Sequence, residues 1–260
     1  GLGSFDYDLS SLTFGKDLGE ALGGAWGGFL SFGQMSMNEH DNASQDLSAT
    51  SYSAGLYGYW QHSGWEHRVV LGYTYGDNSS TRDYSFNGFS ETFDGDYSSQ
   101  ALQAAVRASF DWINSNGYEL RPEVGGSITQ YRQGAFSETG GDVFGLDYAE
   151  AYADTYIVHV GLNGRLPPIS DAAPVRPIGF VRYEYDFASN DDHSVDAALQ
   201  VNPGTYDSFI GQGRGPSTLT AGLGIMSNGA GPLQIEGGIA YADHTNGSEW
   251  GAGMQLRYVW

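Results

Sequence analysis

Hydrophobic and polar side chains alternate with a period of two along most of the chain. From Trp65 to Gly76 the odd positions carry Trp, His, Val, Leu and Tyr, whereas the even positions carry Glu, Arg, Val, Gly and Thr. The segment from Leu102 to Trp112 alternates in the same way. This period is typical of β-strands whose two faces meet different environments, and the scattered glycine and aromatic residues disfavour helices.

The alternation predicts eleven strands separated by turn-rich connections. The expected ranges are 5–18, 25–37, 49–61, 65–76, 96–113, 118–131, 147–165, 175–187, 216–227, 232–242 and 248–260. Single-chain bacterial barrels have an even number of strands, and an open sheet edge in lipid leaves backbone groups unpaired. We therefore expect a twelfth strand upstream of Gly1. The alternative is a strand at His193–Val201, but we interpret residues 188–215 as a long external loop.

Amphipathic strands fit a soluble sandwich or a membrane barrel, and two details favour the barrel. Aromatic residues lie near strand ends at two levels, as in the girdles of membrane barrels. Those beside short turns are Trp60, Trp65, Trp112, Tyr118 and Trp260, and those beside longer loops are Tyr75, Tyr185, Phe187 and Tyr241. The opposite face carries Arg and Glu in mid-strand. We predict an all-β fold, a transmembrane antiparallel barrel of twelve strands in the bacterial outer membrane, with Trp260 at the periplasmic face.

Composition excludes several other classes of protein. The 260 residues have a net charge of −20 and contain no cysteine, which excludes disulfide scaffolds, zinc–thiolate sites and cysteine nucleophiles. So acidic a chain, with Lys16 as its single lysine, is a poor partner for nucleic acid. We expect one domain over residues 1–260, no cofactor and no transmembrane helix, because no run of 18 apolar residues occurs.

Nine short segments follow one another along nearly the whole chain: Phe5–Asp8, Tyr52–Gly58, Gly64–Trp65, Val70–Tyr73, Gly117–Val124, Val160–Arg165, Gly179–Phe187, Thr220–Gly224 and Leu256–Trp260. In their order and spacing they resemble the translocator β-domain of classical autotransporters, the type V secretion proteins. The resemblance implies a twelve-stranded barrel that exports and anchors an N-terminal passenger, with a helix in the pore. We expect passenger, pore helix and first strand upstream of Gly1. Cleavage residues of the family lie around that helix, so none is assigned here.

The charged residues of the polar strand faces are the candidate functional positions. They are Glu66, Arg68, Arg107, Asp111, Glu119, Arg121, Glu123, Arg165, Arg182, Glu184, Glu236 and Arg257. They would line the passenger's path and hold the pore helix through paired charges, or they are cross-strand ion pairs that fill a narrow barrel. The two interpretations are compatible.

The terminal strand presents Leu256, Tyr258 and Trp260 on one face. This pattern resembles the C-terminal signal that the barrel-assembly machinery reads. The alternative is that these residues form only a lipid-facing girdle. Outer-membrane lipid and lipopolysaccharide are further expected partners.

Two other functions are open from the residues. A stand-alone channel would use the inner charges for ion selectivity. A surface protease of the omptin kind would use the acidic groups of Asp191–His193 and Asp94–Asp96, although solvated loop charge explains these groups as well. The histidines show no metal-binding spacing, so we predict no metal site and no enzyme.

Overall fold

The computed structural model describes residues 5–21, 23–39, 45–86, 88–141, 144–170, 175–188, 194–210, 215–227 and 233–258. Every regular element in these ranges is a β-strand. Within them, no helix is long and apolar enough to cross a membrane.

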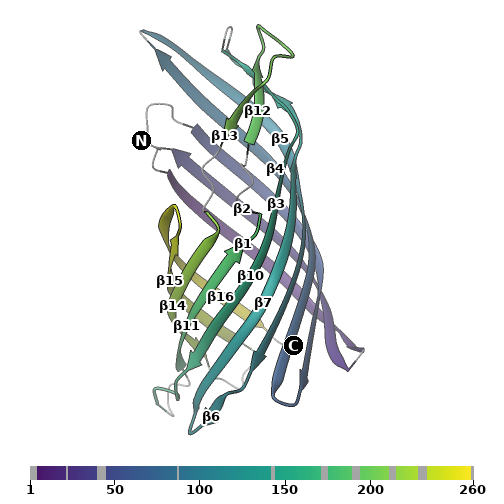
Figure 1. Cartoon of the computed structure of the whole chain (residues 1–260), viewed down its shortest axis with the longest axis vertical. Coiled ribbons are helices and arrows are strands. Elements are labelled where there is room, and N and C mark those ends of the chain that lie inside the picture. The colour runs from purple at the N-terminus through teal and green to yellow at the C-terminus, as the bar shows by residue number, and fades with distance from the viewer. Residues whose placement is uncertain are drawn as a thin grey trace.

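Eleven strands follow one another in a single curled antiparallel sheet (Figure 1). In order they are β1 (Phe5–Ala21), β2 (Gly24–Glu39), β3 (Gln45–His62), β4 (Trp65–Phe86), β5 (Phe89–Phe110), β7 (Tyr118–Gln133), β10 (Ala151–Arg165), β11 (Val175–Asp186), β14 (Ser217–Ser227), β15 (Leu233–His244) and β16 (Gly247–Tyr258). The short β6 (Ile113–Ser115) pairs with β7 beside the end of β5. The all-β barrel-type fold and the eleven predicted strands are thus confirmed.

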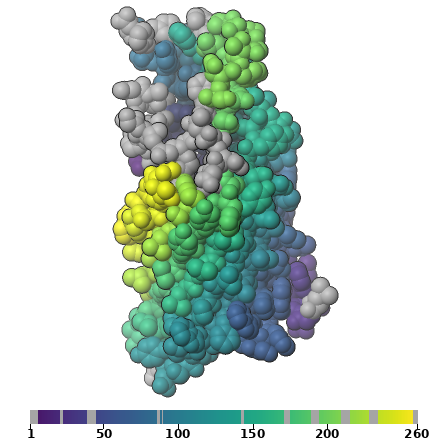
Figure 2. Space-filling model, viewed as in Figure 1, coloured from purple at the N-terminus to yellow at the C-terminus, as the bar shows by residue number. Residues whose placement is uncertain are grey.

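The sheet carries its apolar side chains outward. On the outward face Leu71 is 50% exposed, Leu102 56% and Val160 57%. By contrast, few apolar residues are buried in the described ranges. Figure 2 shows the smooth wall formed by the teal and green strands. This distribution is the reverse of a water-soluble core and suits an apolar surrounding medium.

Two-residue turns set the register at one end of the sheet. Ser63 and Gly64 have φ values of 50° and 82°, and Asn116 and Gly117 have φ values of 51° and 81°. Two successive positive φ angles define the type I′ turn, whose twist matches that of paired strands. The turn at Ser63–Gly64 fixes the pair His62–Trp65, from which the β3–β4 ladder runs to Gln45–Arg82.

The hairpin of β4 and β5 is longer than predicted. Residues 77–92 lie in the connection between the predicted strands 65–76 and 96–113, which we expect to be a loop. The ladder instead continues to the pair Phe86–Phe89, and the turn contains Gly88, whose φ is 86°. The expectation rested on the polar composition of the segment, and it was wrong because backbone hydrogen bonds between strands need only extended chain. The inner face of this hairpin packs against the four-stranded sheet described next.

A second, four-stranded sheet covers that inner face and is called the cap below. It consists of β8 (Phe136–Ser137), β9 (Leu146–Tyr148), β12 (Ser194–Leu199) and β13 (Asp207–Ile210), in the order β13-β12-β9-β8. Figure 1 shows β12 and β13 at the end of the molecule where β4 and β5 project. The region 188–215 is therefore external to the main sheet as expected, but it is not simply a loop. The predicted strand 147–165 is divided between β9 and β10.

An ion pair between the buried Glu138 and the partly buried Arg82, together with a ring stack, holds the cap to the hairpin. The Arg82 guanidinium donates to the Glu138 carboxylate at 2.9 Å and 2.6 Å, and it lies 4.6 Å from the centre of the Phe93 ring. Phe136 stacks between Tyr97 and Tyr148, with ring centres 4.7 Å and 4.4 Å away. Burial raises the pKa of the Tyr148 phenol to about 12.

Candidate functional site: the inner ion-pair network

Charged side chains from five neighbouring strands meet on the inner face of the main sheet, near the end with the two-residue turns. They come from β4, β5, β7, β10 and β11 and from the short segment that follows β5. Because side chains alternate along a strand, every second residue of each strand points inward. The register then brings the charges of separate strands together.

Glu119 is the centre of the first group. One carboxylate oxygen lies 2.7 Å from Arg176 Nη1, and the other lies 3.3 Å from Arg165 Nη1. Arg121 Nη2 approaches the same carboxylate at 3.8 Å. Arg176 also donates to the carbonyl oxygens of Leu166 and Gly117, so it joins two turns to the wall.

Arg121 links this group to β4. Its Nε lies 2.6 Å from Asp111 Oδ1, and its Nη1 lies 3.4 Å from Glu66 Oε2. Glu66 is also 2.6 Å from Arg68, two residues further along its own strand. Glu66 is 8% exposed, so its charge is compensated by two arginines rather than by water.

Glu123 is the centre of the second group. It is 6% exposed and lies 2.9 Å from Arg182 Nη2 and 3.5 Å from Arg107 Nη1. Asn163 donates a 2.8 Å hydrogen bond to its second oxygen. Arg182 also lies 3.7 Å from Glu184, which extends the group along β11. A buried carboxylate is tolerated here because its oxygens have charged or amide donors.

The predicted charges are thereby placed on one wall, apart from two of them. The network borders a cavity of about 330 Å³, which Glu236 lines together with Gln255, Arg68 and Arg107. Glu236 is exposed, and it forms no ion pair within the described ranges. The side chain of Arg257 lies outside the described residues.

Sequence reasoning missed Arg176 and Asn163 as members of this network. Arg176 is 8% exposed and contacts Glu119 directly. Its sequence position contained the signal, because it has the same parity as Arg182 and Glu184 on the strand that begins at Val175. Asn163 likewise has the same parity as Arg165.

The remaining candidate residues are in different places. In the predicted terminal signal, Leu256 faces outward and is 60% exposed, the side chain of Tyr258 is not described, and Trp260 lies outside the described residues. The acidic group Asp191–His193 also lies outside the described residues. Asp94 accepts a 2.8 Å hydrogen bond from Thr81, and its backbone pairs with Thr139. Asp94 is thus part of the junction between hairpin and cap. In the described ranges no cluster of His, Asp and Glu could hold a metal ion.

An outward apolar face, an inner charged face and consecutive antiparallel strands together define the class of membrane β-barrels. The model of the family described as "Autotransporter beta-domain" matches residues 1–240, and the chain belongs to this family. It is an outer-membrane barrel that translocates and anchors a passenger, as the resemblance implied. No curated protein matches the chain significantly.

Three solved structures show the same fold at low sequence identity. The translocator domain of autotransporter NalP from Neisseria meningitidis has a TM-score of 0.68 and 16% identity, over 98% of this chain and 82% of that one. The β-domain of the Bordetella autotransporter BrkA has a TM-score of 0.62 and 14% identity, over 99% and 93%. The transport unit of AIDA-I from Escherichia coli has a TM-score of 0.57 and 13% identity, over 99% and 86%.

Proposed function

We propose that the inner ion-pair network lines the route of the passenger and holds the polypeptide segment that stays in the barrel after export. The observation that carries this proposal is the polar cavity of about 330 Å³, bounded by Glu66, Arg68, Arg107, Glu119 and Glu123. Its polar lining offers hydrogen bonds and charges to a polypeptide backbone and side chains.

The balance of charge favours passage of a polypeptide over its tight binding to the wall. The carboxylates of Glu66, Glu119 and Glu123 are each shared by two or more arginines or amides. A moving polypeptide thus meets few uncompensated charges that would bind it tightly. Among the paired arginines of the network, Arg68 is the most accessible, with 49% of its side chain exposed. Its guanidinium can therefore contact the polypeptide segment that stays in the barrel.

The proposal includes a division of roles along the chain. Residues 1–260 act as a single translocator domain that performs no catalysis and needs no cofactor. The terminal residues Leu256, Tyr258 and Trp260 serve as the signal for the barrel-assembly machinery. The outward face binds outer-membrane lipid and lipopolysaccharide. The apolar exposure of that face, including Leu256 at 60%, supports the last two roles.

Single-channel recording of the complete native protein tests the main proposal. We expect a small and irregular conductance in the wild-type protein, because the retained segment fills the barrel. The double change Glu119→Gln and Glu123→Gln removes the two centres of the network and should give long, large openings. Glu150→Gln is the matched control, because Glu150 pairs with Arg132 on the outward face.

Each variant is first checked for folding by its migration on a gel with and without heating. If the wild-type protein shows a large, steady and ion-selective conductance, the protein is a channel and the proposed role of the network is wrong. If the double variant is folded and conducts like the wild-type protein, the network does not hold a segment.

A further inference from the structure

A patch of apolar side chains lies on the inner face of the main sheet, at the end opposite the two-residue turns. It consists of Tyr7 and Leu9 of β1, Met35 and Met37 of β2, and Leu47 of β3, and it is called the methionine patch below. The register pairs Leu9 with Met35 and Tyr7 with Met37. Met37 also pairs with Leu47, so the patch is continuous across three strands.

The register also shows that the methionine patch faces inward. Met35 pairs with Ala49, and Ala49 pairs with Asn78 of β4, which has the parity of the inward charges of that strand. Paired residues lie on the same face of a sheet. In agreement with this, the Tyr7 hydroxyl donates a 3.4 Å hydrogen bond to Glu249 Oε2 of β16, the last strand of the sheet. The patch therefore shares the interior with the ion-pair network but lies at its other end.

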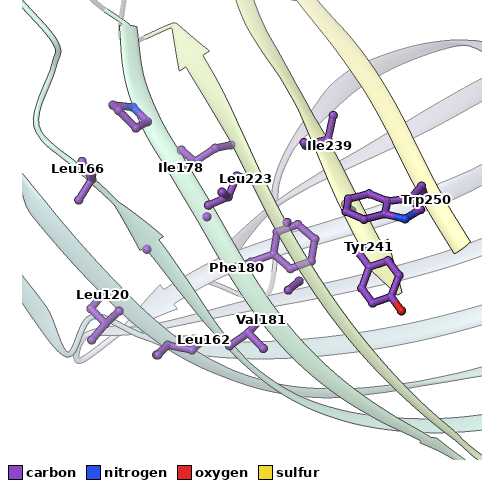
Figure 3. A pocket seen from close by; sticks show the side chains of 16 residues that line it. Leu120, Leu162, Leu166, Ile178, Phe180, Val181, Leu223, Ile239, Tyr241 and Trp250 are labelled. Atoms are coloured by element: carbon purple, nitrogen blue, oxygen red, sulfur yellow. The ribbon is translucent and has the colours of Figure 1, made fainter. Parts of the chain in front are cut away.

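An inward apolar patch is unusual in this molecule. Elsewhere the large apolar side chains lie on the outward face, as Figure 3 shows for Leu223, Ile239 and Trp250 on β14 to β16. In the methionine patch Leu9 is 69% exposed and Tyr7 46%, and both methionines are partly exposed. Bilayer lipid does not reach this face, so an exposed apolar patch here indicates contact with another polypeptide. The flexible thioether side chain of methionine suits such a contact, because it adapts to different partners.

The occupant that fits the patch is the polypeptide segment that stays in the barrel after export, and this step rests on the proposed function. The patch includes residues of β1, which begins at Phe5, so polypeptide upstream of residue 1 lies within reach of it. The chain belongs to the autotransporter family, in which such an upstream passenger is attached. The segment would thus meet polar groups at the network and apolar groups at the methionine patch.

We propose that Met35 and Met37 form an oxidation site for hypochlorous acid, and that their conversion to sulfoxides loosens the retained segment. A sulfur–oxygen bond forms as the oxygen–chlorine bond breaks. Each sulfur loses two electrons, the chlorine leaves as chloride, and the proton of the acid passes to water. A sulfoxide is polar, whereas the thioether is apolar, so the reaction removes the apolar character of the patch.

The other methionines of the chain are internal controls. The sequence contains four methionines and no cysteine, so no thiol competes for the oxidant. Met254 has the parity of the outward Trp250 on β16 and is 74% exposed on the face that meets lipid. Met226 lines the cavity at the network, far along the interior. An aqueous oxidant added on the external side should therefore reach Met35 and Met37 first.

Single-channel recording of the full-length protein, with dilute sodium hypochlorite added on the external side, tests the proposal. We expect the small conductance of the wild-type protein to change to long, large openings. Met35→Leu with Met37→Leu keeps an apolar side chain of similar size but has no sulfur, so this variant should not respond. Met226→Leu with Met254→Leu is the matched control and should respond like the wild-type protein. Methionine sulfoxide reductases should restore the small conductance of the oxidised wild-type protein.

Peptide mapping of the treated wild-type protein by mass spectrometry is the second measurement, and it needs no variant. Sulfoxide should form at Met35 and Met37 before Met226 and Met254. Oxidation of Met226 or Met254 first overturns the site, and so does an unchanged conductance once Met35 and Met37 are oxidised. A dimer that hypochlorite dissociates would make a second copy the occupant and would also overturn the inference. A large, steady conductance before any oxidant is added contradicts the proposed function instead.

Discussion

Replacing Leu71 by arginine tests which face of the sheet meets lipid. Leu71 lies on the outward face of β4, is 50% exposed, and pairs with Leu56 and Ala104. It is the sixth residue after Trp65, so at a strand rise of about 3.3 Å it lies about 20 Å along the strand from the turn. A strand tilt of about 40° reduces this to about 15 Å of height, near the middle of an apolar band about 25 Å tall.

At that depth an arginine on the lipid face costs about 2–4 kcal/mol. The matched control is Val70→Arg, because Val70 is the next residue, is 39% exposed, and faces inward between Glu66 and Asn78 of the same strand. An inward arginine meets a polar interior, so we expect this change to cost less than about 1 kcal/mol.

The assay is reversible guanidinium unfolding of the full-length protein in phospholipid vesicles, followed by tryptophan fluorescence. The difference between the two variants is the informative quantity, because the substituted side chain and the strand are the same in both. A neutral Leu71→Arg with a costly Val70→Arg would show that the faces are reversed. Equal costs in both variants would mean that the two faces meet the same medium, which contradicts a lipid face and a polar face.

Three further predictions concern the cap and the terminus. Glu138→Gln removes the carboxylate that pairs with Arg82, so the stability of the cap should fall by about 3 kcal/mol. Segment 194–210 of the cap should then become sensitive to protease added to intact cells. The control Asp96→Asn changes an exposed outward residue and should not alter cleavage. The raised pKa of Tyr148, about 12 against 10.0 for a free phenol, means that its contribution to cap stability is complete below pH 10 and is lost as pH rises to about 12. Protease sensitivity of the cap should rise over that interval, and Tyr148→Phe should remove this part of the rise; an unchanged profile argues against the buried phenol. Trp260→Ser should lower the amount of inserted barrel and leave chain aggregated in the periplasm, and unchanged outer-membrane levels would remove the proposed terminal signal.

The strands of the barrel could be predicted because the outward face needs apolar residues at every second position. In segments such as Trp65–Gly76, the alternation of apolar and polar residues alone therefore predicts a strand. The inner wall could be predicted only as a set of charges. Which charges pair depends on strand register, which the turn at Asn116–Gly117 and the length of each hairpin decide. The contact between Glu119 and Arg176, which are 57 residues apart in the sequence, depends on the register in this way.

The cap could not be predicted for a different reason. Its core comes from segments far apart in the sequence, so that Gln200 donates to the carbonyl of Glu138 and Arg82 to its carboxylate. Each segment alone is polar and short, and residues 77–92 therefore predict only a long polar connection. Only the assembled hairpin supplies the inner surface on which Phe136 and Tyr148 pack.

Surface display of the passenger tests the central claim most directly. An epitope is inserted into the native full-length protein upstream of residue 1, and antibody binding to intact cells is compared with binding after the outer membrane is permeabilised. A translocator barrel predicts that the epitope is accessible on intact cells, and that accessibility is lost when strands β14 to β16 are deleted. An epitope that antibody reaches only after permeabilisation, in cells whose barrel is folded and inserted, would contradict the account.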